Sequence, residues 1–269
     1  MQKILYTLFS VAVLASCSSS YNIQGTSNIS RLDGQMLYLN VIDQEEIKSI
    51  DSCDVLHGSF NFIGSLDTVR LASVYIDKES LLPVVLESGN ITVSITATQQ
   101  TATGTPLNDK LCSFLKLYSR QLNEMAELTH RHDRAIMNGD NMDIVNAQLA
   151  LDAQKISEKT DKLVTSFIEE NFDNVLGPGV FMMVTAGAVP ALTPWIDALM
   201  SKATSKFKND PYVKNYMFTA QKIQNIQNGT ESLQQEPTPS SLQNTAVSNA
   251  TTPQTAENMQ AQTASAGAN

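Results

Sequence analysis

The densest cluster of possible metal ligands in the sequence is His130-Arg131-His132-Asp133. A metal site on one helix needs ligands three or four residues apart, because only such residues share a face. His130 and His132 are two residues apart and would point to different sides of a helix. Glu127 and His130 do share a face, but two ligands do not complete a structural metal site. The spacing therefore favours a solvated helix surface with paired charges over a metal centre.

The other polar groups that could do chemistry stand alone in the sequence. His57 precedes Gly58 in an expected hairpin turn, and a catalytic role would need a partner brought to it by the fold. Asp43, Glu45 and Glu46 could bind calcium weakly, although they lack the alternating spacing and the glycine of a calcium loop. The sequence shows no metalloprotease, serine-hydrolase, phosphate-loop or dinucleotide motif. We therefore expect no catalytic residue, no metal and no cofactor, and we expect that the protein is not an enzyme.

Cysteines occur at positions 17, 53 and 112. In an oxidising compartment Cys53 and Cys112 could form a disulfide. The alternative is two separate, partly buried thiols that pack as small hydrophobic groups, and this is the favoured interpretation. No two cysteines have the C-x-x-C spacing, which argues against a thioredoxin-type redox site.

Several aromatic residues allow two interpretations. Tyr38, Phe60, Phe62 and Tyr75 could form a flat platform for a ligand such as a carbohydrate, or they could belong to the core of a small sandwich. Trp195 could anchor a core or form the centre of a partner-binding surface. In both cases the core is favoured.

The chain is acidic, with a formal net charge of −9. This charge argues against nucleic acid as a partner, because attraction to phosphate needs clustered Lys and Arg. It also argues against electrostatic attachment to anionic lipid, so that a membrane location would need an anchor.

The first seventeen residues have the organisation of a targeting segment. Lys3 supplies a positive charge, the next eleven residues are mostly apolar and uncharged, and Leu14-Ala15-Ser16-Cys17 ends the segment. Eleven residues are too few to span a bilayer as a helix. The segment resembles the lipobox of bacterial lipoproteins, in which the cysteine becomes the first mature residue and carries acyl chains such as palmitate. The resemblance implies a signal peptide at 1–16 and lipid attachment at Cys17.

The next part of the chain, residues 21–105, has the pattern of short strands. Apolar or alternating segments at 36–41, 60–62, 69–76 and 91–95 are separated by turn sequences such as Asp33-Gly34 and His57-Gly58. Strands at this spacing without intervening helices indicate an antiparallel β-sandwich or a partial barrel, and the sandwich is the predicted architecture. A short serine-rich tether at 17–20 would link it to the anchor.

From Pro106 the apolar period becomes helical. One stripe comprises Leu111, Leu115, Tyr118, Leu122, Met125, His132 and Ile136. Asn138-Gly139 should end this helix, and Asp140 should cap the next. The segment 176–179 breaks the second pattern, and shorter helices are expected at 180–188, 195–204 and 211–226. The sequence thus predicts a helical domain over 106–228, built from a long helical hairpin and shorter helices.

The C-terminal segment 229–269 changes character again. From residue 230 onward it contains no Lys, no Arg and no aromatic residue. Such a composition cannot bury enough apolar surface to offset the entropy of ordering, so a disordered tail is expected. The predicted fold class is therefore α+β, with an N-terminal antiparallel sandwich, a helical domain and a disordered tail.

Residues 21 to about 118 resemble the family called domain of unknown function 4369. The resemblance depends on the order and spacing of turn glycines and core residues, namely Ile23-x-Gly25, Asp33-Gly34, Leu37-Tyr38-Leu39, Ile50-Asp51-Ser52, Val55-x-x-Gly58-x-Phe60-x-Phe62-x-Gly64, Leu86-Glu87-x-Gly89-Asn90-Ile91 and Gly104-Thr105-Pro106-Leu107-Asn108. In the Bacteroidota this module usually precedes a thioredoxin-like domain with a Trp-Cys-x-x-Cys site. No residue of this chain matches those cysteines, so the associated redox activity is not implied here.

The resemblance also bears on location and modification. Surface-exported lipoproteins of this lineage carry acidic residues after the anchor cysteine, whereas this chain has Ser18-Ser19-Ser20-Tyr21. This difference implies an outer-membrane lipoprotein facing the periplasm. Asp67-Thr68-Val69 resembles the short O-glycosylation sequon of envelope proteins in this lineage, which implies a glycan on Thr68.

These features together favour a lipid-anchored, non-enzymatic binding or scaffolding module in the periplasm. Its partners would be the membrane, through the lipid, and an envelope protein or glycan, with no nucleic acid. A second hypothesis is an accessory to thiol-redox or stress chemistry that acts with a separate thioredoxin-like protein. A third is a hydrolase, for which the sequence offers no triad.

Overall fold

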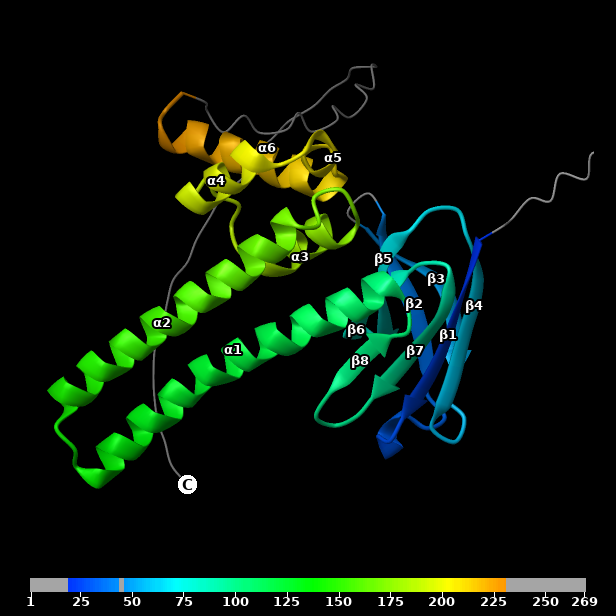
Figure 1. The fold of residues 1–269 in the computed structure, drawn as a ribbon, viewed down its shortest axis with the longest axis horizontal. Helices are drawn as coiled ribbons and strands as arrows, with labels where there is room; N and C mark the ends of the chain where they lie inside the picture. The colour runs from blue at the N-terminus through cyan, green and yellow to red at the C-terminus, as the bar shows by residue number, and fades with distance from the viewer. Residues whose placement is uncertain (1–18, 44–45, 231–269) are drawn as a thin grey trace, which may run out of the picture. The chain divides into compact units, whose positions relative to one another are not determined.

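The computed structural model describes residues 19–43 and 46–230. In this part of the chain all strands precede the α-helices (Figure 1). The strands are β1 (Ser19–Ser27), β2 (Met36–Asp43), β3 (Glu46–Asp54), β4 (Ser59–Leu66), β5 (Arg70–Ile76), β6 (Glu79–Leu86), β7 (Gly89–Ile95) and β8 (Gln100–Thr103), and a short 3-10 helix η1 (Ser30–Leu32) follows β1. β1 therefore includes Ser19 and Ser20, which we expected to belong to the tether at 17–20. The expected signal peptide at 1–16, Cys17 and the tail from residue 231 lie outside the described residues.

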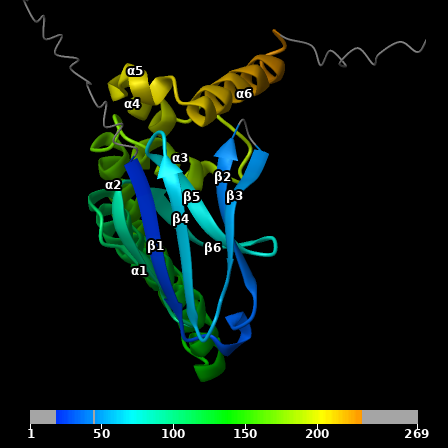
Figure 2. The same ribbon diagram turned by 90° about the vertical axis from the view of Figure 1, so that its right-hand side faces the viewer.

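The strands form two four-stranded sheets, which confirms the predicted α+β class. One sheet has the order β4-β1-β7-β8 and the other β3-β2-β5-β6, and Figure 2 shows strands of both sheets. One pair differs from the antiparallel expectation, because β1 and β7 run parallel. Parallel neighbours need a long crossover, and the chain visits the second sheet twice between these two strands.

The sandwich core forms where the alternating apolar residues of the two sheets meet. Ile23, Leu39 and Ile91 are completely buried there, and each is flanked along its strand by more exposed residues. Two glycines make room for aromatic rings on the neighbouring strand. Gly25 of β1 pairs with Phe60 of β4, Gly64 of β4 pairs with Tyr21 of β1, and a Cβ on either glycine would overlap the partner's ring. Gly25 and Gly64 of the family motif are thus packing positions, whereas its other glycines, at 34, 58, 89 and 104, have positive φ and allow the backbone to turn.

The helices are α1 (Pro106–Asn138), α2 (Met142–Glu169), α3 (Leu176–Thr185), α4 (Pro194–Lys202), α5 (Ser205–Lys208) and α6 (Pro211–Gln227). α1 and α2 form the expected antiparallel hairpin (Figure 1). Gly139 ends α1 in the left-handed conformation, with a φ of 72°. Asn141 rather than Asp140 caps α2, because its side chain accepts the N–H groups of Asp143 and Ile144. Within the described residues, every helix is too short or too polar to cross a membrane.

The prediction that Leu176-Gly177-Pro178-Gly179 breaks the helical pattern is wrong. This segment forms the first turn of α3. Pro178 lies in the first turn, where its missing N–H would have no partner within the helix. The two glycines are needed for close packing: a Cβ on Gly177 would overlap the Asn171 carbonyl, and one on Gly179 would approach Leu71 to 2.6 Å. Composition alone suggested a break, whereas packing against the turn that follows α2 and against β5 requires these small residues.

The apolar stripe predicted along α1 is divided by the structure. Leu111 is buried, whereas Leu122 is 50% exposed and Ile136 is 55% exposed. The buried positions on the same part of the helix are Gln121 and Ala135. The contact with α2 therefore follows a neighbouring stripe, and the distal half of the predicted stripe lies on the surface.

Candidate functional site

A groove of about 540 Å³ lies between β6, β8 and the first half of α1. Its apolar lining includes Leu81 and Leu82 of β6 and Leu115 of α1. The thiol of Cys112 also lines the groove, and seven further lining residues carry hydroxyl or carboxamide groups, namely Thr98, Gln99, Gln100, Thr101, Asn108, Ser119 and Asn123. The volume is in the range typical of ligand sites, and the mixture of apolar and polar groups is suited to a partly polar ligand.

The charged side chains among the described residues that line this groove are Lys116 and Arg120. They are four residues apart on α1 and therefore share one face of the helix. Arg120 also lies 3.9 Å from the carboxylate of Glu124, at the exposed side of the helix. Two cations in an acidic chain favour a ligand that carries negative charge.

Asn108 fixes the inner end of the groove. Its Oδ1 accepts the Val85 N–H at 2.9 Å, and its Nδ2 donates to the Val85 carbonyl at 2.8 Å. Nδ2 also donates to Thr105 Oγ1 at 2.8 Å. Asn108 is completely buried, so these bonds are shielded from water. The side chain pairs with β6 as a neighbouring strand would, and it joins the start of α1 to the sandwich.

Glu87 completes this junction from the end of β6. Its carboxylate accepts the N–H of Leu107 at 2.8 Å and that of Asn108 at 3.1 Å, although Thr105 occupies the N-cap position. A carboxylate at a helix N-terminus satisfies free N–H groups and favours the helix dipole. The motifs Leu86-Glu87-x-Gly89-Asn90 and Gly104-Thr105-Pro106-Leu107-Asn108 therefore meet in space, which sequence reasoning treated only as a family pattern.

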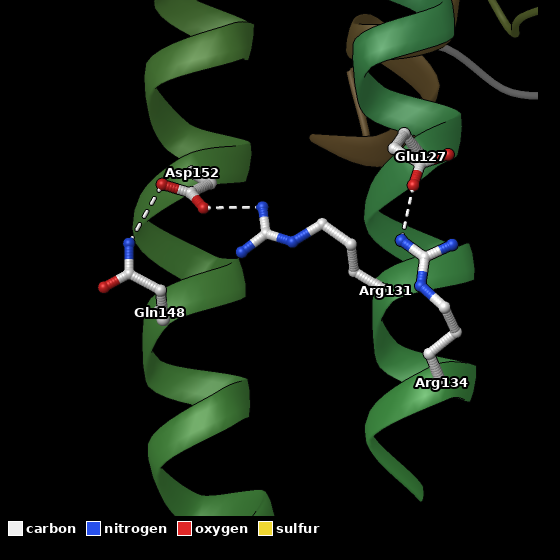
Figure 3. Close-up of polar contacts among 5 residues, drawn as sticks. All are labelled: Glu127, Arg131, Arg134, Gln148 and Asp152. Carbon is white, nitrogen blue, oxygen red and sulfur yellow. Dashed lines mark hydrogen bonds and ion pairs between the residues drawn. The ribbon is translucent and has the colours of Figure 1, made fainter. Parts of the chain in front are cut away.

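The distal half of the α1–α2 hairpin has one strongly charged face, shown in Figure 3. Arg131 of α1 donates to Asp152 of α2 at 2.9 Å, and Gln148 donates to the other carboxylate oxygen at 3.0 Å. Arg134 donates to Glu127 at 2.6 Å. The hydrogen bond from Arg131, followed by that from Gln148, lowers the pKa of Asp152. The bond from Arg134 lowers the pKa of Glu127 in the same way.

The structure places the residues weighed as metal ligands, and judged by their spacing to form a solvated surface, as follows. His130 is exposed, His132 Nδ1 lies 3.6 Å from the adjacent Asp133, and Glu127 is paired with Arg134. No group of three or more His, Cys, Asp or Glu suited to a metal occurs among the described residues.

The remaining polar candidates occupy turns or strand ends. His57 lies in the turn between β3 and β4, with a positive φ of 51°. Asp43 lies 4.0 Å from Lys48, and Glu46 begins β3 opposite Asp43, while Glu45 lies outside the described residues.

Cys53 and Cys112 are both free thiols in the structure. Cys53 lies on β3 beside the sandwich core, and Cys112 is buried on α1. Burial raises the pKa of the Cys53 thiol to about 11, and the charges of Asp51 and Asp54 contribute. Such a thiol contains little thiolate at neutral pH and is a weak nucleophile.

The aromatic candidates divide between core and surface. Phe60 and Phe62 are buried in the sandwich, whereas Tyr38 and Tyr75 are half-buried cross-strand partners on β2 and β5. Trp195 is half-buried, stacks with Phe181 in the helical core and donates to Thr165 at 2.7 Å.

Of the two predicted modification sites, only Thr68 lies within the described residues. It is exposed between β4 and β5, and Arg70 Nη2 lies 3.4 Å from its hydroxyl. The predicted lipidation site, Cys17, lies outside them.

Comparisons with known proteins identify two segments. A search of curated proteins found no match to the chain. Residues 1–18 match the model described as a prokaryotic membrane lipoprotein lipid attachment site, which supports membrane anchoring through a lipid. Residues 21–111 match the family model described as Domain of unknown function (DUF4369). Its range covers both sheets and ends just after Asn108. Residues 21–111 are therefore similar to this family of unknown function, and the segment before them is similar to a lipoprotein attachment site.

Proposed function

We propose that this protein is a non-enzymatic binding module, anchored through Cys17 to the outer membrane and facing the periplasm. Its ligand is an acidic, extended segment of another envelope protein, which binds in the groove beside Asn108. The observation that carries this proposal is the groove itself, with Lys116 and Arg120 above an apolar floor. A peptide with carboxylate side chains complements these cations, and its apolar residues complement Leu82 and Leu115.

The junction of Asn108 and Glu87 supports this role because it fixes the groove walls. Buried hydrogen bonds hold α1 against β6, so little ordering is needed when a ligand enters. An accessory role in thiol-redox chemistry gains no comparable support, because Cys112 is buried and the pKa of the half-buried Cys53 is raised.

The groove can be tested by photo-crosslinking in intact cells. A photoreactive amino acid at Ser119, which lines the groove, should capture a protein whose crosslinked segment is acidic. The same amino acid at Ser113, which is exposed on α1 outside the groove, is the matched control. The product should be lost when Lys116→Glu and Arg120→Glu are combined, but should persist with Lys208→Glu and Lys214→Glu. Capture that persists after reversal of the groove charges, or occurs equally from Ser113, would contradict the proposal.

The anchor has a separate test. Cys17→Ala should move the protein from the membrane fraction to the soluble fraction, while Cys53→Ala should leave it membrane-bound. A Cys17→Ala protein that stays in the membrane fraction would show that another segment holds it there.

A further inference from the structure

A second groove, which we call the interhelical groove, lies between α1 and α2. It has a volume of about 510 Å³ and shares Arg120 and Asn123 with the groove beside Asn108. Along α1 its lining continues through Glu127 to Arg131, at steps of three and four residues, so both grooves use one face of this helix. The two grooves therefore adjoin, and α1 forms a wall of both.

The carboxylates that line the interhelical groove each face an arginine. Asp152 accepts a hydrogen bond from Arg131 at 2.9 Å, and Glu127 accepts one from Arg134 at 2.6 Å (Figure 3). Glu124 lies 3.9 Å from an arginine four residues earlier on the same helix. Because each carboxylate is paired with a guanidinium, the three contribute little net repulsion to an incoming anion, and they do not balance other cations in the groove.

Two lysines of α2 complete the lining of the interhelical groove. Lys155 and Lys159 are four residues apart and share one face of their helix. Both are exposed, and neither forms an ion pair with another described residue. The pKa of Asp152 is lowered first by its hydrogen bond from Arg131 and only last by the charge of Lys155, which acts at longer range. Two unpaired cations therefore remain in a chain of net charge −9, and they attract a negatively charged partner.

We infer that the acidic segment proposed for the groove beside Asn108 continues along α1 into the interhelical groove, where its carboxylates pair with Lys155 and Lys159. This inference deepens the proposed function and rests on it. Leu128 is half-buried and Ile156 is buried, and both provide apolar surface for the uncharged side chains of the ligand. The interhelical groove thus repeats the combination of two cations and apolar residues that the first groove offers.

The length of α1 along the two grooves sets the length of the ligand. The first groove follows α1 from Asn108 to Asn123, which is roughly 22 Å at 1.5 Å per residue. Both grooves together follow it from Asn108 to Arg131, or roughly 35 Å. An extended peptide rises about 3.3 Å per residue. About six residues therefore fill the first groove, and about eleven are needed to reach the end of the second.

The test uses two synthetic peptides with a fluorescent label, (Glu-Leu-Ser)2 and (Glu-Leu-Ser)4. Fluorescence anisotropy measures their dissociation constants for the purified full chain in a neutral detergent. We expect the longer peptide to bind roughly fivefold more tightly, because it alone reaches both exposed lysines of α2. Raising the salt concentration should reduce this advantage, since exposed ion pairs are screened. The uncharged peptide (Gln-Leu-Ser)4 should show no such gain.

Charge reversal separates this inference from the proposed function. Lys155→Glu combined with Lys159→Glu should remove the advantage of the longer peptide and leave the affinity of the shorter one unchanged. Lys208→Glu combined with Lys214→Glu is the matched control, because both positions are exposed and lie outside the two grooves, and it should change neither affinity. Thermal unfolding of both double variants checks that they fold.

The outcomes distinguish two failures. If the shorter peptide binds but the longer one binds no more tightly, or if the advantage survives reversal of Lys155 and Lys159, the inference is overturned and the proposed function stands. If neither peptide binds, the proposed function fails and the inference fails with it.

Discussion

The carboxamide of Asn108 pairs with both backbone groups of Val85, as one residue of a neighbouring strand would. Val85 would otherwise present a free N–H and carbonyl at the edge of β6. We expect Asn108→Ala to lower the free energy of unfolding by about 3 kcal/mol, because both buried backbone groups would lose their partners. Urea unfolding followed by the fluorescence of Trp195, the only tryptophan, measures this loss.

The control for this prediction is Asn123→Ala, an exposed position on the same helix that should change stability by less than about 0.5 kcal/mol. If Asn108→Ala is equally neutral, the junction does not hold α1 to the sandwich.

Gly25 should tolerate no side chain while Phe60 is present. The added methyl group of Gly25→Ala would overlap the Phe60 ring, with an expected cost of about 2 kcal/mol. Combining it with Phe60→Leu should recover part of this loss, because the smaller side chain relieves the overlap. Strict additivity of the two changes in a double-mutant cycle would show that the two residues do not interact.

Cys53 should react slowly with thiol reagents in the native protein. Its pKa of about 11 leaves a thiolate fraction of roughly one in a thousand at pH 8. Because the folded-state pKa is raised, the neutral thiol favours folding below about pH 9, and this contribution is lost as the pH rises towards 11. Alkylation rates of a Cys112→Ala variant between pH 7 and 11 measure this titration, and a midpoint near 9 would contradict it.

Thr68 is expected to carry an O-linked glycan in the native host, because its hydroxyl is exposed within the Asp67-Thr68-Val69 sequence. Intact-mass measurement of the native protein should show a glycan increment that Thr68→Ala removes. Thr98→Ala, at another exposed loop position, should retain the increment. Identical masses for the native and unglycosylated polypeptides would exclude the modification.

The strands were predictable because the two faces of a sandwich impose alternation on the sequence. The segment 91–95 alternates apolar and polar residues, and the structure buries Ile91, Val93 and Ile95. The parallel pairing of β1 with β7 was not predictable, because alternation reports which side a residue faces and not which strand lies beside it.

Helical periodicity had a similar limit. It located α1 and α2, but it could not distinguish the face that contacts α2 from a second apolar face. Gln121 is buried while Leu122 is exposed, and only the packing of the hairpin decides between these neighbours. The groove could not be predicted from the sequence either. Its residues come from β6, β8 and α1, and the sequence does not show that these elements lie side by side.

The position of Val85 has a consequence for where this protein can be divided. Its backbone bonds to Asn108, and its buried side chain packs in the helical core with Phe114 and Phe181. A fragment ending at residue 105 would keep all eight described strands yet expose both the edge of β6 and an apolar side chain. Such an edge recruits strands from other molecules, so the fragment should aggregate on expression. A fragment designed to fold separately should therefore contain the sandwich together with the first turns of α1.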